Sequence, residues 1–197
     1  YFCKYFSKMK IKFSLLLLII PLLSLSQFAN KKLYNIQKTE AKVKIDGVLD
    51  DVIWSKIDAA DIFHQEKPRN GLPERSSHKT EVKIFYDNQN IYFGVMMYDN
   101  NPDSILKELG KRDDENKNND NFSIVIDPFN NTQVEYSLAV TAAGVQIDKK
   151  ISKNGTDKNW NAVWKSSVNV NQNGWSLEIS LPFSQIRYPN NNKSWAL

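Results

Sequence analysis

Strict alternation of apolar and polar residues is the feature that most constrains the fold of this chain. The stretch Trp175-Ser-Leu-Glu-Ile-Ser-Leu181 alternates without interruption. Because successive side chains of a β-strand point to opposite faces of a sheet, this pattern indicates a half-buried strand. It places Trp175 toward the core and Glu178 toward the surface. Glu135 holds a similar polar position in residues 134–141, so we interpret both glutamates as surface acids that could face one another across a sheet.

Short segments of this kind follow one another along the chain, separated by turns rich in Asn, Asp, Gly and Pro. Residues 81–86 and 91–98 flank Asp87-Asn-Gln-Asn90 and predict a hairpin. Further strands are expected over residues 122–127, 134–141, 145–151 and 163–171. Helical signals are short and few, and they lie at residues 50–56, 103–109 and 182–187. The pattern predicts an all-β fold, an antiparallel and jelly-roll-like β-sandwich with a few short helices.

The first part of the chain has the organisation of a secretory leader. Met9 opens a short basic region, residues 15–25 are an apolar run, and Ser24-Leu25-Ser26 supplies small residues before Gln27. We expect residues 1–26 to be an upstream extension plus a cleaved signal peptide, residues 27–40 a lead-in, and residues 41–197 the folded domain. The protein is then exported, to the periplasm, the outer membrane or the medium. Trp195-Ala-Leu197 starts an apolar segment, so the domain is expected to continue in a longer chain.

The charge and the cysteine content exclude several classes of function. The chain has 26 basic and 22 acidic residues, but four of the lysines lie in residues 1–26, which contain no acid. The remainder is neutral, so nothing favours binding to nucleic acid or to an anionic membrane. The only cysteine, Cys3, precedes Met9. The expected domain therefore has no disulfide and no thiolate metal site.

Three aspartates surround a glycine in the stretch KIDGVLDDVIW, residues 44–54, and suit either a chemical site or a turn. Asp46-Gly47 is typical of a turn, because glycine accepts a positive φ. Asp50 or Asp51 can cap the short helix that follows. Neighbouring acids on one helical turn do not provide the facing pair that glycoside hydrolysis requires. We therefore predict that the stretch turns the chain and that Trp54 closes the open end of the sandwich.

Five blocks, in this order, resemble the family 9 carbohydrate-binding modules: KIDGVLDDVIW, YFGVMMYD, DNFSIVIDPFNN, VTAAGVQID and GWSLEISLPFSQIR. The resemblance runs from about Ala41 to Leu197. It extends to the family-9-like domain at the front of large exported bacterial proteins, which continue into a domain of unknown function that looks like an outer-membrane β-barrel. In sugar-binding members an aromatic platform stands just ahead of the segment that matches Asp120, where this chain has Lys117-Asn-Asn119.

The resemblance implies a non-catalytic carbohydrate-binding module of a cell-envelope protein, with a glycan as partner and a link to carbohydrate catabolism and O-glycosyl hydrolase systems. Two alternatives stay open. One is a structural or interaction domain that serves an attached outer-membrane barrel and has lost the sugar site. The other is a glycoside hydrolase, which needs two acids that converge in a cleft.

The candidate glycan-binding residues lie in polar loops. Trp160 follows an Asn/Asp-rich loop, and a flat ring beside amides and carboxylates suits the C–H face and the hydroxyls of a sugar. A buried Trp160 that anchors the loop fits the sequence equally well. Trp164 shares the parity of Val168 and is expected in the core. The other candidates are Asp157, Asn159 and Asn161 beside Trp160, Phe129 in a turn as a weaker platform, and Arg112 in the loop 111–121.

A calcium site is the metal hypothesis that the resemblance suggests, with carboxylates drawn from separate loops. The candidate ligands are acids at strand ends or loop edges: Asp99, Asp113, Asp120 and Asp148. Solvated or turn-forming acids are the alternative, since no loop has the EF-hand spacing. His64 and His78 are the only histidines, which makes zinc a poor fit. No nucleophile motif or phosphate loop indicates catalysis.

The leader generates the first test. Because a signal peptidase cleaves after small residues, N-terminal sequencing of the exported protein is expected to begin at or near Gln27. An intact exported protein that begins before Met9 would contradict this expectation.

Overall fold

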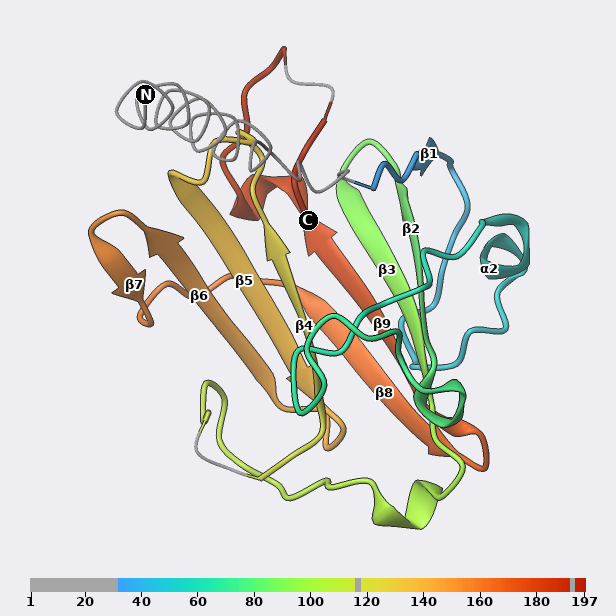
Figure 1. The fold of residues 1–197 in the computed structure, drawn as a ribbon. Helices are drawn as coiled ribbons and strands as arrows, with labels where there is room; N and C mark the ends of the chain where they lie inside the picture. The colour runs from blue at the N-terminus through green and yellow to red at the C-terminus, as the bar shows by residue number, and fades with distance from the viewer. Residues whose placement is uncertain (1–31, 116–117, 192–193) are drawn as a thin grey trace, which may run out of the picture. The chain divides into compact units, whose positions relative to one another are not determined.

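Two β-sheets carry the fold (Figure 1). The computed structural model describes residues 32–115, 118–191 and 194–197, so the expected leader lies outside the described residues. Sheet A has the strand order β1-β2-β3-β9-β8. Its strands are β1 (Gln37–Lys38), β2 (Thr80–Tyr86), β3 (Asn90–Tyr98), β9 (Gly174–Pro182) and β8 (Lys165–Asn171). Sheet B has the order β4-β5-β6-β7. Its strands are β4 (Asn121–Ile126), β5 (Val134–Thr141), β6 (Gln146–Ser152) and β7 (Gly155–Asp157).

The strands follow the predicted segments closely, and all neighbours are antiparallel except β1, which runs parallel to β2. The predicted all-β sandwich is confirmed. The expected hairpin is β2–β3, in which Asp87 Oδ1 accepts the amide hydrogens of Gln89 and Asn90, each at 2.7 Å. These two bonds fix the turn, because an aspartate side chain can replace a backbone acceptor in a tight loop.

The helical segments are shorter than predicted. They are α2 (Val52–Lys56) and the single turns η2 (Ser76–His78), η3 (Pro102–Ser104) and η4 (Phe183–Gln185). The expected helix over residues 103–109 stops after η3, because the Leu106 amide bonds Asp120 Oδ2 at 3.1 Å and Lys107 pairs with Asn119 instead. In the described part, no helix has the length and apolar character that crossing a membrane requires.

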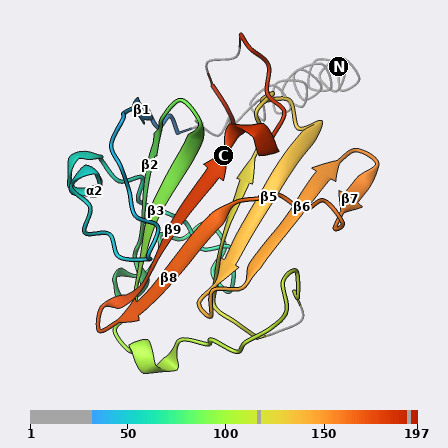
Figure 2. The same ribbon diagram turned by 180° about the vertical axis from the view of Figure 1, so that it is seen from behind.

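The core lies between the inner faces of the two sheets, which Figure 2 shows from behind. The fully buried side chains come from both sheets and include Phe93, Val95, Leu177 and Ile179 of sheet A and Ile126, Leu138 and Val140 of sheet B. Trp175 and Trp164 are also buried, as their parity predicts. Period-two alternation therefore identifies the inner face correctly.

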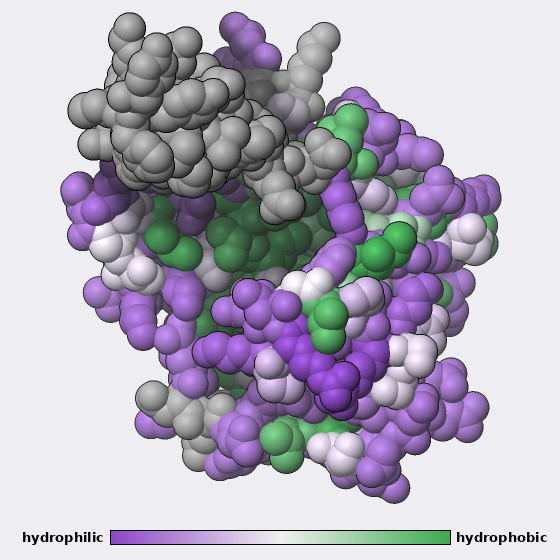
Figure 3. Space-filling model, in the orientation of Figure 1, coloured by the Kyte–Doolittle hydropathy of each residue, from purple (hydrophilic) through white to green (hydrophobic). Residues whose placement is uncertain are grey.

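The end of β4 is paired with the last described residues of the chain. β4 is the outermost strand of sheet B, and Asp127, just after it, exchanges two backbone hydrogen bonds with Ala196 at 2.9 and 3.0 Å. On the face drawn in Figure 3, hydrophobic residues gather in a hollow near the centre of the view, with hydrophilic residues to its left and below. These backbone bonds fit the expected strand that starts at Trp195.

The outer face of sheet A is covered rather than exposed, which corrects the expectation for Glu178. Glu178 is completely buried, because the segment before α2 lies over it. Its Oε2 accepts the amide hydrogens of Asp46 and Gly47, each at 2.9 Å, and its Oε1 accepts the indole N–H of Trp54 at 2.8 Å. Glu135 is on β5 of the other sheet, so the two glutamates do not face one another. Burial raises the pKa of Glu178, and the three N–H donors oppose that shift.

Trp54 packs on this outer face and does not close the end of the sandwich. A Cβ at Gly94 of β3 would lie 2.8 Å from two carbons of the Trp54 ring, so the glycine makes the contact possible. Trp54, Ile57 and Phe85 form a buried cluster here. Asp46-Gly47 forms the expected turn, with φ of +87° at the glycine. Asp51 precedes α2 without capping it, and its Oδ2 accepts the Lys44 amide hydrogen at 3.0 Å instead.

The buried carboxylate generates a stability prediction. Glu178→Ala leaves three buried N–H groups without an acceptor, and each such group costs about 1–3 kcal/mol. The free energy of unfolding, measured with urea, is therefore expected to fall by about 3 kcal/mol or more. Glu135→Ala is the matched control, because its side chain is only half-buried, and it should change stability by about 0.5 kcal/mol or less. Equal effects of the two substitutions would contradict the role of Glu178.

Candidate functional site

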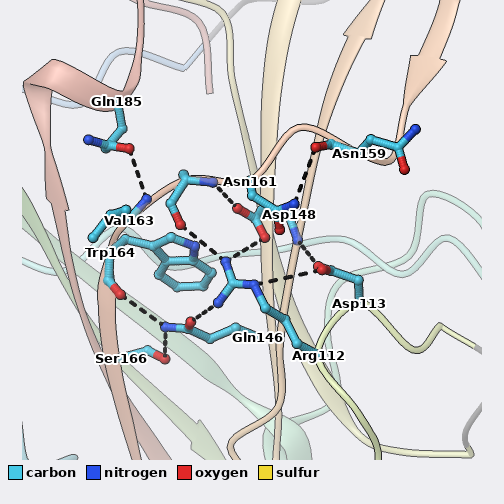
Figure 4. A network of polar contacts seen from close by, with 11 residues as sticks. Arg112, Asp113, Gln146, Asp148, Asn159, Asn161, Val163, Trp164, Ser166 and Gln185 are labelled. Carbon is cyan, nitrogen blue, oxygen red and sulfur yellow. Dashed lines mark hydrogen bonds and ion pairs between the residues drawn. The ribbon is translucent and has the colours of Figure 1, made fainter.

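A polar network centred on Arg112 joins the two sheets (Figure 4). Arg112 Nη2 donates to Asp148 Oδ1 at 2.7 Å and to the carbonyl of Ala162 at 3.1 Å. Its Nη1 donates to Gln146 Oε1 at 2.5 Å. The guanidinium thus uses its planar set of donors to connect the loop after η3, strand β6 and the segment before β8.

Strand β6 positions the acceptors of this network. Gln146 and Asp148 pair with Val140 and Leu138 of β5, so they point toward the interior at the edge where sheet B ends. The Gln146 side-chain amide donates to Ser166 Oγ on β8 at 2.9 Å. The two sheets are therefore connected by side-chain hydrogen bonds at the edge where β6 and β8 approach.

The polar loop 111–121 is ordered along β6 where the structure describes it. The Asp113 amide donates to the Gln146 carbonyl at 3.0 Å, and the Asp148 amide donates to Asp113 Oδ1 at 3.1 Å. Glu115 accepts from Lys149 and Lys158, each at 2.8 Å, and these cations lower its pKa to about 2. Glu115, in this loop, is thus held by ion pairs to Lys149 and Lys158.

Asp148 is a buried charge with an arginine partner. Its side chain has no exposed surface, whereas 40% of the Arg112 side chain is exposed. Burial raises the pKa of Asp148, while the Ala162 amide at 2.5 Å and the Arg112 charge act in the opposite direction. The network therefore has a buried acidic end and a solvent-facing cationic end.

Trp160 is neither the exposed sugar platform nor the fully buried loop anchor that the sequence allowed. It is half-buried, and its ring centroid is 5.1 Å from that of Tyr136, at an interplanar angle of 51°. Tyr136 is a core residue, 2% exposed, so it anchors Trp160. Trp160 is consequently a loop anchor that is still partly exposed.

The polar residues beside Trp160 form its exposed rim. The Asn159 amide donates to Asp157 Oδ1 at 3.0 Å, and the Asn161 side-chain amide donates to the Asn159 carbonyl at 3.2 Å. All three residues are exposed. Asn159, Asn161 and Arg112 appear together in Figure 4. Phe129 is 38% exposed in the β4–β5 turn and takes no part in this network.

The four proposed calcium ligands are not gathered into one site. Asp113 and Asp148 are close, but Arg112 lies between their carboxylates, 3.7 Å from one and 2.7 Å from the other. Asp120 accepts the Leu106 amide hydrogen, and Asp99 accepts that of Asn101. Across residues 32–115, 118–191 and 194–197, no three His, Cys, Asp or Glu side chains form a group that could hold a metal ion. Calcium binding stays a prediction.

Two features of this region were not anticipated. Asp127 is 3% exposed and fixes the β4–β5 turn, since its carboxylate accepts the amide hydrogens of Phe129, Asn131 and Thr132 at 2.7–3.0 Å. The signal was present in Asp-Pro-Phe-Asn-Asn, because an aspartate before a turn often accepts from the amides that follow. The indole N–H of Trp164 is buried without a hydrogen-bond partner among the described residues, and no sequence pattern indicates that.

Comparison with known proteins identifies the family. The family described as "Carbohydrate family 9 binding domain-like" matches residues 45–197. The chain therefore belongs to this carbohydrate-binding family, which confirms the resemblance found in the sequence. Domains of this family are non-catalytic binding modules, which agrees with the binding role that the resemblance implies for residues 45–197. No curated protein matches the chain.

Solved structures share the fold. A family 9 module from Caldicellulosiruptor kristjanssonii in complex with cellotriose has a TM-score of 0.55 and 14% identity, covering 81% of this chain and 72% of that one. The module in complex with glucose has the same TM-score and identity, covering 81% and 73%. A crystal structure from Bacteroides uniformis ATCC 8492 has a TM-score of 0.56 and 11% identity, covering 76% and 72%.

The Arg112–Asp148 pair generates the second stability prediction. Arg112→Ala leaves a buried carboxylate without its cation, which costs about 3–5 kcal/mol in a fully buried pair. Because water can enter on the exposed side of Arg112, we expect about 2–3 kcal/mol from urea unfolding. Arg69→Ala, at an exposed arginine, is the control and should be nearly neutral.

A double mutant distinguishes the loss of the Arg112–Asp148 charge pair from a simple loss of side-chain packing. Asp148→Asn removes the buried charge, so Arg112→Ala should cost less in that background than in the wild type. Strict additivity of the two substitutions would show that the charge pair does not stabilise the fold.

Proposed function

We propose that this domain binds a neutral glycan at the exposed surface formed by Trp160, its rim of Asp157, Asn159 and Asn161, and the outer side of Arg112. The observation that carries the proposal is the position of Trp160, anchored from below by Tyr136 and bordered by exposed amides. A sugar ring places C–H groups on such an aromatic surface and directs its hydroxyls to the amides. The anchor reduces the entropy lost on binding, because the ring is already held.

Membership of the carbohydrate-binding family supports this ligand class. The Caldicellulosiruptor kristjanssonii module binds cellotriose and glucose, which makes short β-glucans the first probes for this chain. The wider setting is part of the proposal: an exported cell-envelope protein whose domain brings a carbohydrate-degrading system to its substrate. The basic and apolar leader in the sequence is the support for export.

A structural or interaction domain attached to an outer-membrane barrel is the second candidate. It is favoured by the contact between Trp160 and Tyr136, since a ring that anchors a loop needs no ligand to explain it. The two functions differ in what the exposed part of the ring does. Binding measurements on one variant therefore distinguish them.

Trp160→Ala is expected to weaken the affinity for cellotriose at least tenfold in isothermal titration calorimetry, because it removes the aromatic surface. The same substitution should lower the free energy of unfolding by about 1–2 kcal/mol, between the values for exposed and core aromatics. Phe129→Ala is the matched control, an exposed aromatic outside the network, and should retain binding.

Two outcomes would contradict the proposal. If Trp160→Ala bound cellotriose with unchanged affinity, the glycan would not bind at this surface. A wild-type domain that binds no neutral oligosaccharide on a broad panel would favour the structural candidate.

A further inference from the structure

Residues 160–164 lie between β7 and β8 and belong to neither strand, so their backbone groups need other partners. Side chains of β6 and of the loop after η3 supply two of them. The Ala162 amide donates to Asp148 Oδ2 at 2.5 Å, and the Ala162 carbonyl accepts from Arg112 Nη2 at 3.1 Å. The 160–164 segment, which begins with Trp160, is therefore held on the side of β6.

Gln185 holds the same segment from the side of sheet A. The Val163 amide donates to Gln185 Oε1 at 2.8 Å (Figure 4). Gln185 is the last residue of η4, the single turn that follows β9 directly. Val163 is 77% exposed, so without Gln185 its amide would be left to water. Gln185 thus connects the end of sheet A to the segment that carries Trp160.

The residue two positions after η4 also holds the ring beneath Trp160. The Arg187 amide donates to the hydroxyl oxygen of Tyr136 at 3.1 Å. Tyr136 is the core residue whose ring contacts that of Trp160. Gln185 and Arg187 therefore fix both the backbone that follows Trp160 and the aromatic ring on which Trp160 rests.

The turn η4 is itself firmly attached to the domain. The Phe183 amide donates to the Gln89 carbonyl at 2.8 Å, which joins η4 to the β2–β3 turn, and the Ile186 amide closes η4 on the Phe183 carbonyl at 3.3 Å. The Phe183 ring centroid lies 5.7 Å from that of Tyr188 and 6.1 Å from that of Trp195. Ile186 is buried. The acceptor of Gln185 is consequently carried by a turn that has a defined place.

We infer that Gln185 is a positioning residue for the glycan-binding surface, acting on Trp160 through the Val163 amide. The inference rests on the proposed function at Trp160 and adds to it a side chain from the end of sheet A. Groups that touch a ligand bind it better when a supporting layer of hydrogen bonds already holds them. Without the Gln185 acceptor, the Val163 amide bonds to water, and the 160–164 segment gains freedom that a bound sugar must remove.

The test uses the full chain and measures its affinity for cellotriose by isothermal titration calorimetry. Gln185→Met keeps the length of the side chain and removes the acceptor, so the affinity should fall about three- to tenfold, the factor for one ordinary hydrogen bond. Gln185→Glu keeps an Oε acceptor for the Val163 amide and should retain the wild-type affinity. Gln172→Met is the matched control, at an exposed glutamine at the other end of β9, and should bind as the wild type does.

The position of Trp160 is measured separately, without a ligand, in the ¹⁵N-labelled chain. Its indole N–H signal is identified as the one that Trp160→Ala lacks. This signal should shift and broaden in Gln185→Met and keep its wild-type position in Gln185→Glu. The indole signal of Trp175, a buried residue on β9, should stay the same in both variants, because a general loss of folding would move the two signals together.

The outcomes separate this inference from the proposed function. If Gln185→Met binds cellotriose as well as the wild type does, while Trp160→Ala does not bind it, the positioning role is overturned and the glycan site stands. Equal losses of affinity in Gln185→Met and Gln185→Glu would also overturn the role, since the acceptor would not be the group responsible.

A wild type that binds no neutral oligosaccharide would overturn the proposed function. The Trp160 indole signal then decides the inference by itself. A shift in Gln185→Met that is absent in Gln185→Glu would support the hold of Gln185 on Trp160, and an unchanged signal in Gln185→Met would overturn it.

Discussion

The carboxylate of Glu178 is the interaction on which the rest of the domain depends. It lies in the central part of sheet A, fully buried, and receives three N–H donors from a segment more than 120 residues earlier in the chain. No cation is among the donors that the structure describes at this carboxylate. The bonds hold the turn at Asp46-Gly47 and the Trp54 ring over sheet A, so this sheet is covered on both faces. The Trp54 ring packs against Phe85 of β2 and Gly94 of β3, so this cover supports both strands.

The fold was predictable because its signals are local. Alternation with period two marks a strand wherever it occurs, and the predicted segments match β2 to β9 within a few residues, with the three-residue β7 as the exception. The same pattern failed at Glu178 for a physical reason. Alternation assigns a side chain to a face but does not say what covers that face. The cover here is a segment 132 residues away, and no local pattern carries that information. The position of Trp54 was predicted wrongly for the same reason, because Gly94, against which its ring packs, lies far along the chain in β3.

The candidate site, like the fold, could be predicted only in part from the sequence. Residue chemistry pointed to the polar loops as the binding region, which stays a prediction, and Arg112, Asp113, Asp148, Asn159 and Asn161 lie in one region (Figure 4). Their roles were less predictable. A carboxylate at a loop edge suits calcium, an arginine or a backbone amide equally well, and the choice depends on contacts such as Arg112–Asp148, 36 residues apart. The exposure of Phe129, in contrast, could be predicted from the local sequence. Its exposure follows from the turn that Asp127 fixes, and the turn, unlike the network, is readable from adjacent residues.

Glu178 and Asp148 are both buried, but they differ in whether their polar networks reach the solvent. The Glu178 carboxylate accepts three N–H groups from within the fold, so this buried acid supports the structure. Asp148 is satisfied by Arg112, whose other side is exposed, so that network ends at the solvent. Because most of its inner donors and acceptors are already paired, a ligand at the β6–β8 edge can only use the rim and the exposed part of Trp160.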